Sequence, residues 1–228
     1  VNIDKEDEFE QIWDLLGVQS QPSAATRPWM VTNGNHERFY NWTAYRHRYK
    51  APYERSGGSV DGFWYSYNYG NVHWTSISSE HDLSEGSEQR AWLIHDLEKA
   101  TAPEQRALYP WVVLSIHKPM YCSVGEGGTY GEYAALLEEL LIQYDVDLYI
   151  SGHMHAYERI HPTKEGEVTC FPDPVPSRRP SLSGLHSNSV DVYHSMGKGP
   201  VQLMQGNAGG MQAEKFCHPA PEWSAFRM

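Results

Sequence analysis

The chain has 228 residues, of which 40% are hydrophobic and 13% aromatic, and this content is enough for one domain with a sizeable core. Its 18 Lys and Arg against 29 Asp and Glu give a net charge of −11 at pH 7, which disfavours binding to nucleic acid or to an anionic membrane surface. No apolar run approaches the roughly 18 to 20 residues of a membrane span. We therefore expect a single domain over residues 1–228, with no nucleic-acid partner and no membrane span.

The termini, cysteines and sequon give weaker indications. Because Val1 is neither a start methionine nor part of a signal peptide, we expect a processed or truncated chain. Three cysteines leave at least one thiol unpaired within the chain, and Cys170 with Cys217 is a candidate surface bridge, whereas the pairing of Cys122 stays open. One glycosylation sequon begins at Asn41, as in many secreted proteins.

The first half of the chain predicts a helix, a strand and a hairpin in that order. Apolar residues recur at helical spacing over 6–16, and Gly17 is a reasonable stop. The short apolar run at 29–32 predicts a strand that leads into a polar turn. Residues 63–78 are rich in aromatic and β-branched types around Gly70, which predicts a β-hairpin.

The second half alternates helices and strands. Ser87 is placed to cap a helix that ends near residue 100, and 132–144 repeats the helical pattern. Strands are predicted at 111–116 and 146–150. This alternation predicts an α/β fold with a partly parallel sheet and helices on its faces.

Residues 160–199 change in composition toward Pro, Ser, Gly and His, and they show no clear periodicity. This composition predicts a long loop or insertion. An apolar pattern resumes at 200–204.

Three of the predicted strands end in polar clusters that contain histidine. Asn35 and His36 follow the first strand, His117 follows the second, and His153 and His155 follow the third. Because the carboxyl ends of strands in an open α/β sheet converge on one crevice, we expect these side chains to meet. A single histidine at a strand end is commonly only a hydrogen-bonded cap, but four imidazoles and an amide at three ends favour a site for Zn, Fe or Mn.

The same clusters carry a family resemblance. Residues 34–37, the strand ending in His117 and residues 152–155 resemble three ordered motifs of the calcineurin-like metallophosphoesterases, and the extension 156–159 (AYER) is similar to that of the purple acid phosphatases. The resemblance covers nearly all of the chain apart from 160–199. It implies an α/β (α+β) fold in which a β-sandwich is flanked by helices.

The resemblance also implies roles for single residues. Asn35, His117 and His153 would bind a divalent metal (Zn, Mn or Fe), and His155 would bind the second ion, Fe(III). His36 would bind the phosphate and assist departure of the leaving group. The implied activity is hydrolysis of phosphate monoesters by a metal-bound hydroxide, as in an acid phosphatase that is secreted, at the cell surface or in a lysosome- or vacuole-like compartment. The resemblance leaves open whether the protein forms a homodimer.

Two further motifs of the family, Asp-x-Gly and Gly-Asp-x-x-Tyr, are absent from this chain. The nearest candidates, Asp4, Asp7, Asp14 and Tyr40, lack the required sequence context. We therefore expect an N-terminally incomplete domain without its front strands, and Met228 also looks like an early end.

Without a bridging carboxylate, this chain alone is not expected to bind two metals tightly. The alternatives are a phosphatase-like structural or binding subunit that lacks catalysis, and a phosphodiesterase or nucleotide pyrophosphatase of the same superfamily.

Overall fold

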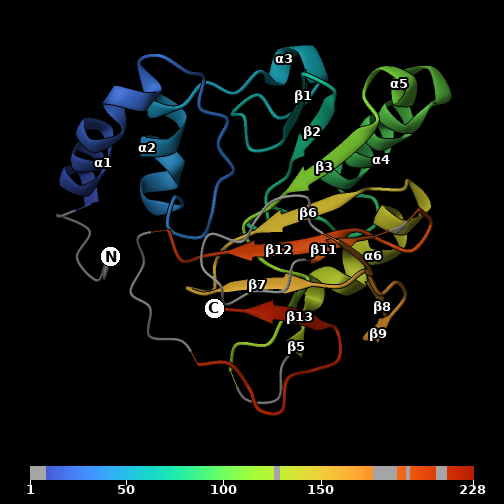
Figure 1. Ribbon diagram of the computed structural model, residues 1–228. Helices are drawn as coiled ribbons and strands as arrows, with labels where there is room; N and C mark the ends of the chain where they lie inside the picture. Colours follow the sequence, from blue (N-terminus) through green and yellow to red (C-terminus); the bar gives the residue numbers. More distant parts are fainter. Residues whose placement is uncertain (1–8, 126–128, 177–188, 194–195, 209–214) are drawn as a thin grey trace.

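Seven strands form one mixed sheet in the computed structural model, which describes residues 9–125, 129–176, 189–193, 196–208 and 215–228 (Figure 1). In spatial order the strands are β1 (Tyr65–Tyr69), β2 (Val72–Ser76), β3 (Trp111–Ser115), β6 (Leu148–Ser151), β12 (Val201–Gln205), β7 (Tyr157–Ile160) and β13 (Ser224–Arg227). The four strands from β2 to β12 run parallel, whereas β1, β7 and β13 pair antiparallel with their neighbours. The sheet confirms the α/β class.

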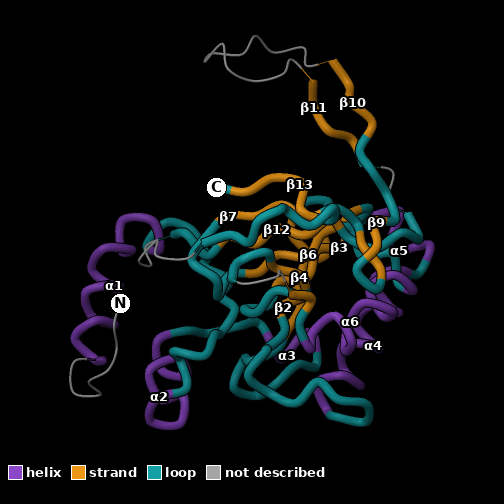
Figure 2. Tube along the Cα trace, turned by 90° about the horizontal axis from the view of Figure 1, so that it is seen from below, coloured by secondary structure: helices purple, strands orange, loops and turns teal. Residues whose placement is uncertain are grey.

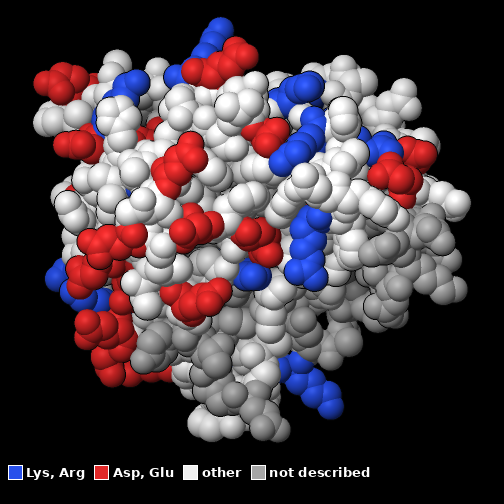
Figure 3. Space-filling view, turned by 180° about the vertical axis from the view of Figure 1, so that it is seen from behind, with Lys and Arg blue, Asp and Glu red and all other residues white. Residues whose placement is uncertain are grey.

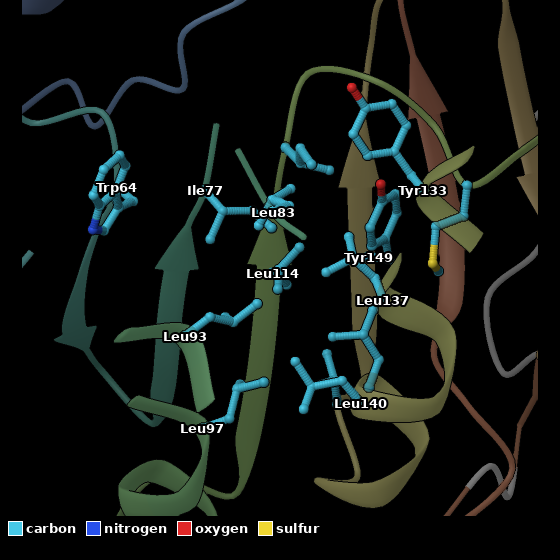
Figure 4. Packing of buried hydrophobic residues seen from close by; sticks show 14 of the residues in the cluster. Trp64, Ile77, Leu83, Leu93, Leu97, Leu114, Tyr133, Leu137, Leu140 and Tyr149 are labelled. Carbon is cyan, nitrogen blue, oxygen red and sulfur yellow. The ribbon is translucent and has the colours of Figure 1, made fainter. Parts of the chain in front are cut away.

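Helices α4 (Glu88–Thr101), α5 (Pro103–Leu108) and α6 (Glu132–Gln143) lie on one side of this sheet (Figure 2). Ser87 caps α4 as predicted, since its side chain accepts a hydrogen bond from the Arg90 backbone N–H. Figure 4 shows the leucines of α4 and α6 facing Leu114 and Tyr149 of the strands. The main hydrophobic core therefore lies between the sheet and these helices.

The opposite face of the sheet is also apolar. Tyr69, Trp111 and Phe226 lie on this face and are exposed by 76%, 54% and 47%. Helices α4, α5 and α6 leave this face open (Figure 2). The side chains expected of a sandwich interior are thus present on this face.

Two helices lie beyond the carboxyl ends of the parallel strands (Figure 1). Helix α1 (Phe9–Ala24) continues through Gly17, so the predicted stop at that residue is wrong. Glycine lowers helix propensity without forbidding the helix, and α1 extends past Gly17 to Ala24 although it contains Pro22. Helix α2 (Phe39–Arg48) is interrupted at Tyr40, Asn41 and Trp42, which have positive φ. The short helix α3 (Tyr53–Ser56) lies near β1.

The predicted strand at 29–32 is also wrong, because this segment is held by side chains and not by a β-ladder. The Thr32 hydroxyl lies 2.8 Å from Ser76 Oγ and 3.0 Å from Ser115 Oγ. The Tyr65 hydroxyl donates to the Val31 carbonyl at 2.8 Å. The segment therefore crosses the ends of β2 and β3 without backbone pairing.

The described part of 160–199 is more regular than the loop predicted from composition. It contains two short hairpins, β8 (Thr163–Lys164) with β9 (Glu167–Val168) and β10 (Asp173–Pro176) with β11 (Ser189–Val192). Strands of two residues are too short to show a period of two, and the positive φ of Glu165 and Gly166 makes the turn. Residues 177–188 and 194–195 lie outside the described part. A third pair joins β4 (Tyr121–Cys122) to β5 (Thr129–Tyr130).

The remaining observations concern cysteines and surface charge. Cys170 and Cys217 are not in a disulfide, so the candidate bridge between them is not formed. Cys217 is buried, and its backbone N–H donates to the Ser123 carbonyl at 2.7 Å. Asp and Glu side chains form a broad patch on the face seen in Figure 3. None of the described helices combines the length and hydropathy needed to cross a bilayer.

We predict that the core packing of α4 dominates the stability of the domain. Leu97 is fully buried, so Leu97→Ala should lower the free energy of unfolding by about 2–5 kcal/mol. Leu108 at the end of α5 is 64% exposed, and Leu108→Ala should change it by less than about 0.5 kcal/mol. Urea unfolding followed by circular dichroism measures both values, and equal losses would contradict the assignment of the core.

Candidate metal centre

The five residues predicted for the site line one cavity of about 450 Å³. Asn35 and His36 come from the turn before α2, His117 follows β3, and His153 and His155 follow β6. Strands β3 and β6 are parallel neighbours, with Ser115 opposite Ile150. Because both chains leave the sheet at the same edge, their histidines enter the same space.

Three donor atoms in this cavity are in direct contact. His117 Nε2 lies 2.8 Å from Asn35 Oδ1 and 3.1 Å from His153 Nδ1. The two imidazole rings cross at 74° with their centroids 4.9 Å apart. Two metal–ligand bonds of about 2.1 Å at a right angle would place donor atoms about 3.0 Å apart. One amide oxygen and two imidazole nitrogens therefore fit a single divalent cation of the Zn, Mn or Fe type.

Backbone packing sets the position of His117. A Cβ at Gly34 would lie 2.7 Å from His117 Nδ1, which is closer than real contacts allow. The Gly152 backbone N–H donates to the His117 carbonyl at 2.9 Å, and this bond joins the two loops that follow β3 and β6. His153 has φ of 65°, a conformation rarely adopted by residues other than glycine. The backbone of the two loops that follow β3 and β6 therefore brings the imidazole rings of His117 and His153 together.

Burial favours the neutral form of two histidines in this cavity, His117 and His36. Burial lowers the pKa of His117 to about 4, and the neighbouring charge of His153 acts in the same direction. Burial also lowers the pKa of His36, to which His155 and Arg38 contribute, whereas Glu80 opposes the shift. A neutral imidazole is the form that binds a metal.

Carboxylates do not contribute to the cavity wall in the described part of the chain. Its described lining contains no Asp or Glu. Among the described residues, no group of three or more His, Cys, Asp or Glu side chains is placed so that it could hold a metal ion. The contacts that join Asn35, His117 and His153 thus involve one amide and two imidazoles, and His155 lines the same cavity.

The acidic and phenolic candidates from the front of the chain lie elsewhere. Asp14 forms an ion pair with Arg48 at 2.8 Å, and Tyr40 is 53% exposed. Asp4 and Asp7 lie outside the described residues. The sequon residue Asn41 is exposed.

Several residues around the cavity were not predicted from the sequence. Gln205 and Gly206, at the end of β12, line it together with Met154. The apolar run of β12 followed by glycine was the signal, because it obeys the same strand-end rule as the histidine clusters. Lys118 follows His117 directly and forms an ion pair with Glu80 at 3.2 Å. This pair has no sequence signal, because its two members are brought together only by the fold.

Comparison with known proteins identifies relatives of this chain. Residues 3–157 match the family of the calcineurin-like phosphoesterases. Acid phosphatase type 7 of Danio rerio is 34% identical over 95% of this chain, and purple acid phosphatase 18 of Arabidopsis thaliana is 34% identical over 97%. These alignments cover 49% and 45% of the relatives, so the chain spans about half the length of the curated relatives it matches.

A solved structure shows the same similarity in three dimensions. The purple acid phosphatase PPD1 from yellow lupin seeds superposes with a TM-score of 0.72 at 25% sequence identity. The superposition covers 98% of this chain and 38% of that structure.

We predict that Gly34→Ala displaces the His117 ring, because the added methyl group has no space beside it. The imidazole nitrogen resonances of His117 in NMR spectra should shift, and the contact with Asn35 should be lost. Gly17→Ala is the matched control, since a Cβ at Gly17 meets no atom within 4 Å. The control should leave His117 unchanged and stabilise α1 by up to about 1 kcal/mol. Unchanged His117 resonances in Gly34→Ala would contradict the close packing.

Proposed function

Because this chain belongs to the calcineurin-like phosphoesterases and, among them, to the purple acid phosphatases, we propose that it carries part of the active site of a metal-dependent acid phosphatase. The observation that supports this proposal most strongly is the contact of Asn35 and His153 with the same nitrogen of His117. The proposed substrates are small phosphate monoesters.

The purple acid phosphatase family uses a dinuclear metal centre. In our proposal Asn35, His117 and His153 hold the divalent ion, which is Zn, Mn or Fe, and His155 contributes to the site of a ferric ion, Fe(III). The chemistry that two bound cations supply is neutralisation of phosphoryl charge and activation of a water molecule. An amide oxygen and imidazole nitrogens suit these borderline metals.

His36 is proposed as the proton donor. Its side chain lines the cavity beside the proposed ligands, and the residue is exposed at the rim, where a leaving group departs. Its imidazole N–H would hydrogen-bond the phosphate and give the proton to the leaving-group oxygen. Because burial lowers the pKa of His36, the protonated form that acts as an acid is present chiefly at acidic pH.

The proposal extends to the location of the protein. The sequon at Asn41 lies on an exposed residue, which is the condition for attachment of a glycan. We propose that the protein is a glycoprotein that is secreted, at the cell surface or in a lysosome- or vacuole-like compartment. A shift in gel mobility after enzymatic deglycosylation would support it.

We predict that His155→Ala in the full-length protein abolishes hydrolysis of p-nitrophenyl phosphate, because one proposed metal ligand is lost. Elemental analysis should find about two transition-metal ions per wild-type subunit and fewer in the variant. His47→Ala changes an exposed histidine of α2 outside the cavity, and it should leave both values unchanged. A wild-type protein without metal or activity would instead favour a phosphatase-like binding subunit, and preferential cleavage of diesters would favour a phosphodiesterase.

We also predict that His36 sets the alkaline limb of the pH profile. For the wild-type protein, kcat/KM should fall as pH rises from about 5 to 7, because the general acid loses its proton. His36→Gln should lower kcat/KM at acidic pH and flatten this decline. His47→Gln should keep the wild-type profile. A profile of unchanged shape in His36→Gln would assign the decline to another group.

A further inference from the structure

A second cavity of about 400 Å³ lies at the β1 edge of the sheet, lined by residues of β1, β2, α3, α4 and α5. Figure 1 shows these elements at one end of the molecule, away from α1 and α2. Its described lining shares no residue with the lining of the candidate metal centre. The volume falls within the range of small-molecule sites. Nothing in the proposed phosphatase mechanism uses this cavity.

Three basic side chains surround the cavity. Arg55 comes from α3, and His95 and Lys99 lie one turn apart on α4. No ion pair joins Arg55 or Lys99 to an acidic side chain in the described part of the chain. On a chain with a net charge of −11, unpaired cations around one cavity create a local site for an anion.

The only acid in the described lining, Asp96, is buried and already satisfied. Its carboxylate accepts hydrogen bonds from Ser66 Oγ at 2.5 Å and from Thr75 Oγ1 at 2.8 Å, and it lies 3.1 Å from His73 Nε2. The other ring nitrogen of His73 lies 2.7 Å from Asn68 Oδ1. The negative charge of Asp96 is therefore balanced within a rigid floor that links β1 and β2 to α4, and it does not cancel the basic rim.

Apolar residues complete the lining, among them Met30 and Ala100. Tyr67 also belongs to the lining, but its ring stacks on Trp74 on the face of β1 opposite the side chains of Ser66 and Asn68. The polar contacts available to a ligand therefore come from the basic rim, where Arg55 offers a planar fork suited to phosphate oxygens.

We propose that this cavity is a second anion site, which binds the phosphate group of a small phosphate compound. Arg55 and Lys99 bind the phosphate. The site is independent of the metal centre and does not depend on the proposed function.

The test uses calorimetric titration of metal-stripped protein at low ionic strength, with phenyl phosphate, inorganic phosphate and benzoate as probes. Phenyl phosphate and inorganic phosphate should both bind more tightly than benzoate, because each provides the phosphate group. The double variant Arg55→Ala/Lys99→Ala should weaken the binding of phenyl phosphate by at least about tenfold, the loss expected for charge-assisted contacts. The matched control Arg27→Ala/Lys50→Ala removes the same charge from exposed residues outside the cavity, and it should stay within about twofold of wild type.

Four outcomes would overturn the proposal. The first is no binding of phenyl phosphate at about 10 mM, a concentration that would detect even millimolar affinity. The second is an equal loss in the control, which would indicate a general effect of net charge. The third is benzoate binding as tightly as phenyl phosphate. The fourth is binding that persists in the double variant but is lost in His117→Ala, which would place the anion at the metal centre.

Discussion

The parallel pairing of β3 with β6 is the constraint on which the candidate metal centre depends. The ladder continues past the strands, because the Ile116 N–H donates to the Ile150 carbonyl at 3.0 Å and the Gly152 N–H donates to the His117 carbonyl at 2.9 Å. These bonds fix the distance between the two loops before any side chain is considered. His117 and His153 then enter the same space at the edge of the sheet, where their rings are in contact.

Charge balance in this centre depends on more than its contacting residues. An amide and two imidazoles provide geometry for a cation but no negative charge to offset it. Glu80 is the acid whose field acts on both His36 and His117, and it is paired with Lys118. The cluster is therefore a preorganised part of a site, and tight binding of two cations requires carboxylates in addition to it.

The two cavities differ in the sign of the ion that their side chains favour. At the metal centre burial lowers the pKa of His117, so its neutral form is favoured and an incoming cation supplies the charge. In the second cavity Asp96 already has hydrogen-bond donors on both oxygens, and the unpaired groups are basic and exposed at the rim. A strongly acidic chain thus has one cavity suited to cations and one suited to anions, each set by a few local groups.

The sequence alone determined the features that depend on local periodicity and on strand ends. The hairpin of β1 and β2, the cap at Ser87, helices α4 and α6, strands β3 and β6, and the meeting of His117 and His153 all followed from apolar spacing and from the convergence of parallel strands. Asn35 also joins them, but it follows a segment that is not a strand, so the strand-end rule does not account for its position. Tertiary structure decided the features that depend on long-range contacts. It held residues 29–32 by side chains without a ladder, and it placed Arg55 of α3 and Lys99 of α4 around the same cavity. Periodicity reports which face of an element is buried, but it carries no information about which distant segment lies against that face.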